Sequence, residues 1–461
     1  MSIEVQTPQH PSAASTALPR RLGASAATAV VVGEVVGIGI FLTPSEMARS
    51  LASPFWLFAA WGTVGAISIC GALCFGALAA RHPEDGGAYV YLKRAFGPRV
   101  AFQYGWTSLL VADPGITAAM AAGLATYAAS LVPMSALGLK LAAIAAIWLA
   151  AAANIVGLRA GARALQGLTA LKLGLLAAIV AWGFGSEAGS WSHFRPFLER
   201  PIDAPPLGPA LVGGLLAAFF SLAGWWDVAK LAGEARDPER TVPRALVLGV
   251  GLVTIAYMGV AAAFWYLVPL SAVDAERGFA AQAGAAMFGA AGGRVFAAVV
   301  VVSVMGSLVG LLMAAPRVYH TMARDGLFPA WLAAVHPRLG TPARAVAIQA
   351  AAASALAATG TFEQILSYFM AVAIAFLALA AATVYFIPAT AGAGRVPGHP
   401  FTPLGFIVPA VAILAMQAAS DPIRSGIGMG VVALGIPASG FFLKATRASS
   451  ATMVPDDSHS E

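Results

Sequence analysis

The sequence predicts an all-α integral membrane protein with about twelve transmembrane helices, and three observations carry this prediction. Hydrophobic residues make up 59% of the 461 residues and the mean hydropathy is +0.79. Charged residues make up 10%, against about 25% in a typical soluble domain. Apolar runs of the length needed to cross a bilayer recur along the chain, without the short alternation of an outer-membrane barrel. Soluble enzymes, nucleic-acid-binding proteins and disordered chains are therefore excluded, because none could bury so much apolar surface.

The apolar runs lie between charged residues or Pro and Gly, and they form two series. The first series is expected at residues 24–51, 55–80, 99–132, 138–157 and 163–185. The second is expected at 209–233, 243–269, 290–322, 343–359, 362–388, 402–419 and 424–444. Residues 1–22 and 446–461 are polar and are expected to be disordered tails; the first has no early basic segment of a signal peptide.

The positions of Lys and Arg test this topology. With both termini in the cytoplasm, 19 basic residues lie on the cytoplasmic side, seven lie on the opposite side, and Lys172 lies inside a span. This bias follows the positive-inside rule. The net charge of +6 is therefore attributed to membrane topology, and no nucleic-acid partner is expected.

No long hydrophilic domain interrupts the spans. The longest polar stretches are 81–98, 186–208 and 323–342, which are too short to form an ATPase domain. A channel, a secondary carrier or an intramembrane enzyme remains. A channel would require a ring of like residues around a pore. An enzyme would require a nucleophile–base pair or a metal cluster at membrane depth, and the sequence indicates neither, so no enzymatic activity, metal or cofactor is expected.

Two spans contain residues that break a helix, and they occupy matching positions in the two series. Span 1 carries Gly37-Ile38-Gly39 before Thr43-Pro44, and span 6 carries Ser221-Leu222-Ala223-Gly224. Paired breaks of this kind are typical of an inverted repeat with a binding site at the breaks. The amide N–H groups that begin the second half of a broken helix suit a carboxylate, and the freed carbonyl groups suit an ammonium group. Since Gly is abundant, the pattern alone leaves plain helix packing equally open.

Several motifs resemble the amino acid–polyamine–organocation superfamily, most closely the bacterial relatives of the L-type amino acid transporters. They occur in the expected order between residues 24 and 345: Gly37-Ile38-Gly39-Ile40-Phe41, Gly86-Gly87-Ala88-Tyr89, Gly224-Trp225 with Glu234 and Asp237-Pro238, and Arg324-Asp325-Gly326-Leu327-Phe328-Pro329. The resemblance implies a leucine-transporter-like fold. Residues 23–390 would form ten core helices in a five-plus-five inverted repeat with helices 1 and 6 broken, and 391–445 two peripheral helices.

The resemblance also implies where an amino acid would bind. The backbone of Gly37, Ile38 and Gly39, with Ile40 beside it, would hold the α-carboxylate. Carbonyl groups at Phe220, Ser221 and Leu222 would hold the α-ammonium group. The Phe220 side chain corresponds to an aromatic lid over the substrate, and Ser307 is expected to line the side-chain pocket.

Lys172 lies in the middle of a predicted span, too deep for its side chain to reach the interface comfortably. A charge at this depth indicates a functional role. In sodium-independent members of the resembled family, a Lys here occupies the place of a coupling sodium ion and ties the broken first helix to span 8. We expect the same role in this chain.

Three acidic residues need separate interpretation. Glu34 lies one turn before Gly37; it could pair with Lys172, serve as a proton site, or face an aqueous vestibule. Asp113, where the L-type relatives do not generally carry an acid, could couple protons, contact a basic substrate group, or pair with another core residue. Asp227 precedes Lys230 by three residues, a spacing that predicts a salt bridge.

These observations predict a sodium-independent amino acid carrier of a bacterial inner membrane, working by alternating access as an exchanger or a proton-coupled permease, and taking neutral amino acids. The alternative is a carrier of amines, polyamines or cationic amino acids that uses Asp113 or Glu34. No disulfide-linked heavy chain is expected, because residues 133–139, where the L-type relatives of animals carry the linking cysteine, contain no Cys. The expected partners are a small amino acid and the lipid bilayer, with the protein a monomer or a weak homo-oligomer.

Overall fold

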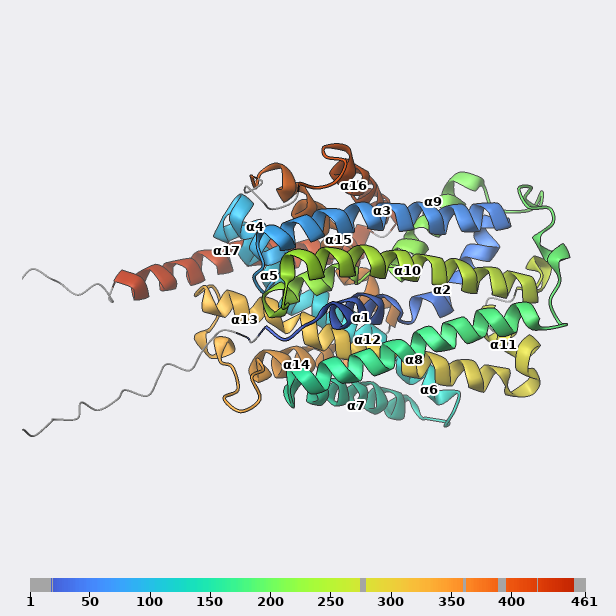
Figure 1. Ribbon diagram of the computed structural model, residues 1–461, viewed down its shortest axis with the longest axis horizontal. Coiled ribbons are helices and arrows are strands. Elements are labelled where there is room, and N and C mark those ends of the chain that lie inside the picture. The colour runs from blue at the N-terminus through green and yellow to red at the C-terminus, as the bar shows by residue number, and fades with distance from the viewer. Residues whose placement is uncertain are drawn as a thin grey trace, which may run out of the picture.

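The helices of the protein run along the long axis of an elongated bundle (Figure 1). The computed structural model describes residue 18 and residues 20–273, 279–359, 362–388, 395–420 and 422–451. Its first half contains α1 (Ala24–Val35), α2 (Gly39–Leu51), α3 (Pro54–Arg81), α4 (Ala88–Phe96), α5 (Pro98–Thr107), α6 (Asp113–Ala129), α7 (Ala136–Ile155) and α8 (Leu158–Gly185). Its second half contains α9 (Leu207–Ser221), α10 (Pro238–Leu267), α11 (Phe279–Phe288), α12 (Gly292–Ala314), α13 (Pro316–Arg324), α14 (Ala343–Thr359), α15 (Phe362–Ala382), α16 (Phe401–Ser420) and α17 (Pro422–Ala451).

The predicted all-α membrane architecture is confirmed. Within the described residues no strand forms, and the one β-bridge joins Leu22 to Ala235. Eight of the described helical segments are long and apolar enough to span a membrane, or nine if the bent pair α1 and α2 is counted as one span. Three shorter apolar helices lie at Ala343–Thr359, Ala371–Tyr385 and Ser425–Gly440. They coincide with predicted spans, and the total of twelve remains a prediction.

The core helices pack in two groups. In one group α3 and α1 pack along α10, and α2 packs along α9. In the other, α6 packs against α7, α12, α14 and α15. Helix α8 contacts α1 and α10 of the first group and α12 of the second. The broken helices therefore belong to one group, and α1 packs against α12 of the other.

The two ends of the described chain lie toward the same end of the bundle (Figure 1). Most of the expected N-terminal tail lies outside the described residues, but its last residues are bound. The N–H groups of Arg21 and Leu22 donate to the carbonyl oxygen of Glu234 at 2.8 Å, and the N–H of Arg236 donates to Leu22 O at 3.0 Å. We call this contact the N-terminal clasp. At the other terminus α17 runs to Ala451, beyond residue 446 where a tail was expected to begin.

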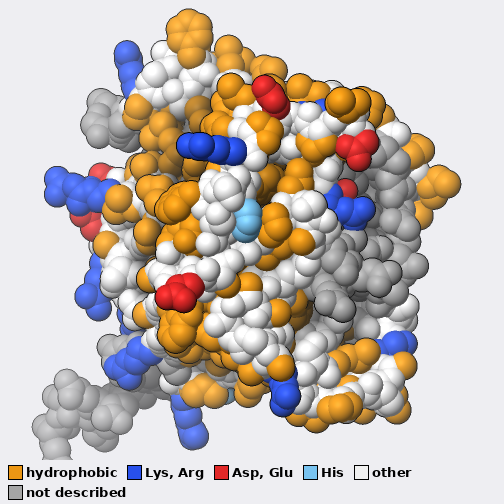
Figure 2. Space-filling view, turned by 90° about the vertical axis from the view of Figure 1, so that its right-hand side faces the viewer, with side chains coloured by type: hydrophobic (Ala, Val, Ile, Leu, Met, Phe, Trp, Pro, Cys, Tyr) orange, Lys and Arg blue, Asp and Glu red, His pale blue; other side chains and the backbone are white. Residues whose placement is uncertain are grey.

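Figure 2 shows the molecule from the opposite end, along its long axis. Charged side chains on this face are few and scattered among apolar and small residues. Large apolar side chains are also exposed on the flanks of the bundle, among them Leu149, Trp182, Leu248, Ile255 and Leu434. A soluble protein rarely exposes so many large apolar side chains on its helices, so these flanks fit contact with lipid.

Candidate functional site

The first span is broken at the predicted glycines. Helix α1 ends at Val35, α2 begins at Gly39, and the two axes differ by 46°. Within the break the N–H of Gly37 donates to Val35 O at 2.7 Å. This N–H group was expected to bind the carboxylate of a substrate, but in this structure it donates to the backbone of the same span. The N–H of Phe41 already donates to Ile38 O at 3.1 Å, so the N–H groups of Gly39 and Ile40 are the donors at the start of α2 that have no acceptor inside that helix.

The carbonyl groups freed at this break are bound by side chains from three other helices. Lys172 of α8 donates from Nζ to Gly33 O at 2.6 Å and to Val36 O at 2.7 Å. The same ammonium group donates to Ser303 O of α12 at 2.9 Å and contacts Ser307 Oγ at 3.2 Å. The hydroxyl of Tyr257 on α10 donates to Val35 O at 2.8 Å. The ammonium group of Lys172 therefore links backbone carbonyl groups of the broken helix to one of α12.

The sixth span is broken as well. Helix α9 ends at Ser221, and Gly224 has φ of +104°, a left-handed conformation that a residue with a side chain adopts at a cost. The chain then continues as η3, a 3₁₀ helix from Trp225 to Glu234. A 3₁₀ helix rises by more per residue than an α-helix. The second half of this span therefore covers a long distance with few residues.

The two breaks touch each other. The hydroxyl groups of Thr43 on α2 and Ser221 on α9 lie 2.8 Å apart, and Ser221 also donates to Ala217 O. A Cβ atom added to Gly39 would lie 2.7 Å from the Cα of Ser221. Only a residue without a side chain allows this approach, so Gly39 is required for contact between the two half-helices.

We therefore expect Gly39→Ala to separate the two half-helices. The added methyl group would meet backbone, which cannot rotate away, so the variant should lose about 1–3 kcal/mol of stability, as overpacked sites do. Melting in detergent and amino acid uptake would both be measured. Gly62→Ala on α3 is the control, because an added Cβ there meets nothing within 4 Å. Equal melting temperatures for the two variants would contradict the prediction.

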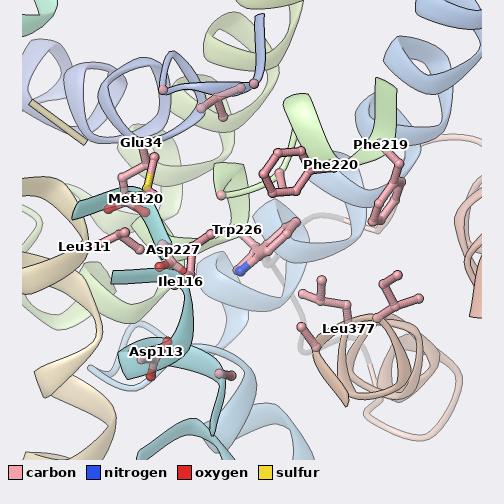
Figure 3. Close-up of a pocket in the computed structure, with 18 of the residues that line it drawn as sticks. Glu34, Asp113, Ile116, Met120, Phe219, Phe220, Trp226, Asp227, Leu311 and Leu377 are labelled. Carbon is pink, nitrogen blue, oxygen red and sulfur yellow. The ribbon is translucent and has the colours of Figure 1, made fainter. Parts of the chain in front are cut away.

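A cavity lies where the breaks face α6 and α15. It encloses about 940 Å³, including the part open to solvent. Its walls combine backbone from both breaks with apolar side chains and a group of charged residues. Figure 3 shows the carboxyl-bearing side chains on one side and the aromatic ones on the other. The polar and charged side chains in the wall are Glu34, Tyr104, Ser108, Asp113, Ser221, Asp227 and Lys230, and the aromatic ones include Phe219, Phe220 and Trp226.

Most of the predicted binding residues line this cavity, and three do not. Those in its wall are Gly37, Ile38, Gly39, Phe220 and Ser221. Ile40 and Leu222 are buried away from it. Ser307, expected to line the pocket, is fully buried and donates to Gly33 O at 2.8 Å instead. Its hydroxyl faces the α1 backbone, because the freed carbonyls need donors, and it belongs to the cluster around Lys172.

Asp113 is positioned by a distortion in its own helix. A π-helical turn, Ser108–Ala112, separates α5 from α6, and Pro114 directly follows Asp113. Proline supplies no N–H to the helix ladder, and π turns are frequent at functional sites. This local geometry brings the Asp113 carboxylate into the cavity wall, where it accepts a hydrogen bond from the Tyr319 hydroxyl at 2.8 Å.

Lys230 joins the two packing groups across the cavity. Its Nζ lies 3.0 Å from Asp227 Oδ1, which confirms the predicted salt bridge between neighbours on η3. It also lies 3.1 Å from Asp113 Oδ1 of α6. Of the three roles open for Asp113, pairing with a core residue is the one this geometry displays. Glu34 does not pair with Lys172: neither of its carboxyl oxygens accepts a hydrogen bond from the described chain.

A second buried ion pair lies toward the end of the bundle that holds the termini. Arg317 Nε of α13 donates to Glu234 Oε1 of η3 at 2.7 Å, and both side chains are at most 2% exposed. The carboxyl of Asp85, in the loop before α4, lies nearby. Burial, reinforced by the negative charge of Glu234, raises the pKa of Asp85 to about 8.

The raised pKa of Asp85 predicts a pH-dependent stability. Its ordinary pKa is 3.8, so between about pH 4 and about pH 8 the folded protein holds a proton that the unfolded chain has released. Stability should therefore fall as the pH rises through this window. Asp85→Asn carries no such proton and should flatten the fall of melting temperature between about pH 5 and about pH 8. Asp203→Asn, at an exposed position, is the control; an unchanged slope in Asp85→Asn would refute the assignment.

Sequence reasoning missed several residues of this region. Tyr257 contacts the α1 break and Tyr319 contacts Asp113 through their hydroxyl groups, yet neither has a local sequence signal of that role. Met120 also escaped notice: an added Cβ at Gly37 would lie 2.4 Å from its Cε atom. Its flexible side chain fills the space beside the break.

Comparison with known proteins finds matches to transporters over most of the chain. The profile that describes the amino acid permease family matches residues 22–436. An uncharacterized transporter of Mycobacterium tuberculosis is 31% identical over 432 residues, 91% of each chain. The serine/threonine exchanger SteT of Bacillus subtilis is 27% identical over 91% of this chain and 96% of its own length. The human cystine/glutamate transporter is 26% identical over 92% of this chain and 86% of its own.

Proposed function

The chain belongs to the amino acid permease family, and from this premise we propose that it is a sodium-independent carrier of neutral amino acids in a bacterial inner membrane, with both termini in the cytoplasm. Membership confirms the resemblance to the amino acid–polyamine–organocation superfamily and makes the protein a multi-pass membrane transporter of amino acids rather than an enzyme. Exchange and proton-coupled uptake are the two modes that the proposal includes.

The observation that carries the proposal is the contact between the two helix breaks beside one cavity. An amino acid has a carboxylate and an ammonium group on one carbon, and each break offers a complement to one of them. The first N–H groups of α2 and the positive end of its dipole suit the carboxylate. Carbonyl groups at the α9 break suit the ammonium group. Phe220, half-buried in the cavity wall, would cover the bound substrate.

Sodium independence is supported by the surroundings of Lys172. Its ammonium group already donates to two carbonyl oxygens of the broken helix and one of α12. These oxygens are hard ligands of the kind that would hold a metal cation. With an ammonium group among them, a sodium ion at the same place would be repelled. Transport should therefore proceed equally in sodium and choline buffers.

A second candidate, a carrier of amines or cationic amino acids, is favoured by one observation. Three carboxyl groups, those of Glu34, Asp113 and Asp227, line the cavity, against the single ammonium group of Lys230. A substrate with an additional positive charge would compensate the excess. Serine and threonine, which are named for the Bacillus subtilis relative, carry no such additional charge.

A thermal-stability screen in sodium-free detergent solution separates the two candidates. Each neutral amino acid would be compared with its decarboxylated amine and with lysine and arginine. A ligand at 100 times its Kd adds about 2.7 kcal/mol if it binds only the folded protein. Stabilisation by neutral amino acids and not by amines is expected. Stabilisation by amines alone would overturn the carboxylate site at the α1 break and establish the second candidate.

A further inference from the structure

The charged groups in the cavity wall do not balance. Glu34, Asp113 and Asp227 carry carboxyl groups, Lys230 carries the one ammonium group among the described lining residues, and each of the four is at most 5% exposed. Buried groups without a counter-charge become neutral rather than remain ionised. A proton or another cation is therefore needed at this end of the cavity.

The hydrogen-bond partners show which of the three carboxyl groups needs the additional positive charge. The carboxylate of Asp113 accepts hydrogen bonds from Lys230 and from the Tyr319 hydroxyl, and Asp227 forms an ion pair with the same Lys230. Glu34 receives no hydrogen bond from any N–H or O–H of the described chain. Its carboxyl lies in the same cavity wall as that of Asp227, and Figure 3 shows the two labelled side chains on the same side of the cavity.

Two neighbouring carboxyl groups can form a hydrogen bond only if one of them is protonated, because a carboxylate is purely an acceptor. A shared proton would supply the donor that Glu34 lacks and remove the excess negative charge in one step. We propose that the Glu34–Asp227 pair holds one proton in this conformation, and that this proton crosses the membrane together with the substrate in each transport cycle. This inference rests on the proposed function and names its coupling ion.

The titratable groups around the pair are consistent with a single proton site. From η3 come Asp227 and Lys230, and from α6 comes Asp113. Lys172 approaches from α8, but its ammonium group is bound to the α1 carbonyl groups. The α12 surface beside Glu34 is formed by Gly310, where an added Cβ would lie 2.6 Å from Glu34 Cγ, and by Leu311. The remaining titratable groups near the cluster are the phenols of Tyr104, Tyr257 and Tyr319.

The position of the pair explains how the proton would be coupled to substrate. Glu34 lies directly before the break of α1, and Asp227 lies directly after the break of α9. A substrate that bridges the breaks would hold the two carboxyl groups together and retain the proton between them. When the half-helices separate toward the cytoplasm, water reaches both groups. The proton then leaves to the inner solution, and the two carboxylates are solvated.

The test uses the full-length protein in liposomes with the membrane potential held at zero. Tritiated L-serine and tritiated L-leucine are the probes, each measured in two assays. In the first, an alkaline interior drives accumulation; one proton per substrate allows up to about tenfold accumulation per pH unit. In the second, external label exchanges for internal unlabelled amino acid at equal pH. Wild type should perform both, and Glu34→Gln should lose accumulation by at least tenfold more than it loses exchange.

Glu46→Gln is the matched control, because Glu46 is an exposed glutamate on α2 and its variant should accumulate as wild type does. Wild-type exchange without accumulation in a pH gradient would overturn the proton site and leave the proposed function intact. Failure of wild type in both assays with both probes would count against the proposed function instead. Infrared spectroscopy then decides the inference separately: wild type should show the C=O stretch of a buried protonated carboxyl group that Glu34→Gln lacks, and identical spectra would reject it.

Discussion

Lys172→Ala is expected to reduce amino acid uptake in sodium-free buffer to a tenth of the wild-type rate or less. The ammonium group of Lys172 binds two carbonyl oxygens at the α1 break and one on α12. Without it, the hydroxyl groups of Ser303 and Ser307 are the remaining donors to Gly33 O and Val36 O. The half-helix that begins the substrate site would lose its fixed position, and a tenfold loss corresponds to about 1.4 kcal/mol of transition-state stabilisation.

Initial rates in liposomes would be measured with and without sodium. Lys140→Ala, which removes an exposed ammonium group from α7, should transport normally. A melting temperature measured on both variants separates lost positioning from lost folding. Normal sodium-free uptake by Lys172→Ala would show that this lysine does not hold the broken helix in its active form.

Arg317→Ala is expected to produce the largest loss of stability, about 3–5 kcal/mol. The guanidinium group of Arg317 and the carboxylate of Glu234 are both almost fully buried, so removal of one leaves the other as an uncompensated buried charge. Since folded proteins are stable by only about 5–15 kcal/mol, the variant should unfold at a much lower concentration of sodium dodecyl sulfate in mixed micelles.

Two comparisons identify the cause of that loss. Arg94→Ala breaks the ion pair between Arg94 and Glu84, whose side chains are 46% and 51% exposed, and it should cost less than about 1 kcal/mol. Replacement of both buried partners, in Arg317→Met with Glu234→Gln, should recover part of the stability because no lone charge remains. Equal losses in Arg317→Ala and Arg94→Ala would contradict the assignment.

The features that could be predicted from the sequence depend on local chemistry. Apolar runs predict the spans, because a helix is the structure that satisfies its backbone within lipid. The breaks at Gly37 and at Leu222–Gly224 follow from glycine and from neighbours that interrupt a helix. The Asp227–Lys230 pair could be predicted because residues three apart share a helix face.

The features that could not be predicted depend on contacts distant in sequence. Asp113 and Lys230 are 117 positions apart, and no local pattern indicates that α6 and η3 face each other across a cavity. Ser307 illustrates another limit. Its position on a core helix was foreseen, but the choice between the cavity and the α1 backbone depends on where unpaired carbonyl groups lie, which is a property of the folded breaks.

The N-terminal clasp has a consequence for how the protein is made. The segment at Leu22 leaves the ribosome first, but its partners at Glu234 and Arg236 follow roughly two hundred residues later. At 5–20 residues per second, that is a delay of about 10–40 s, during which the first half of the chain enters the membrane without this contact. The clasp therefore forms only after span 6 has been inserted, and a nascent chain stalled earlier would leave its first segment open to proteases at the membrane surface.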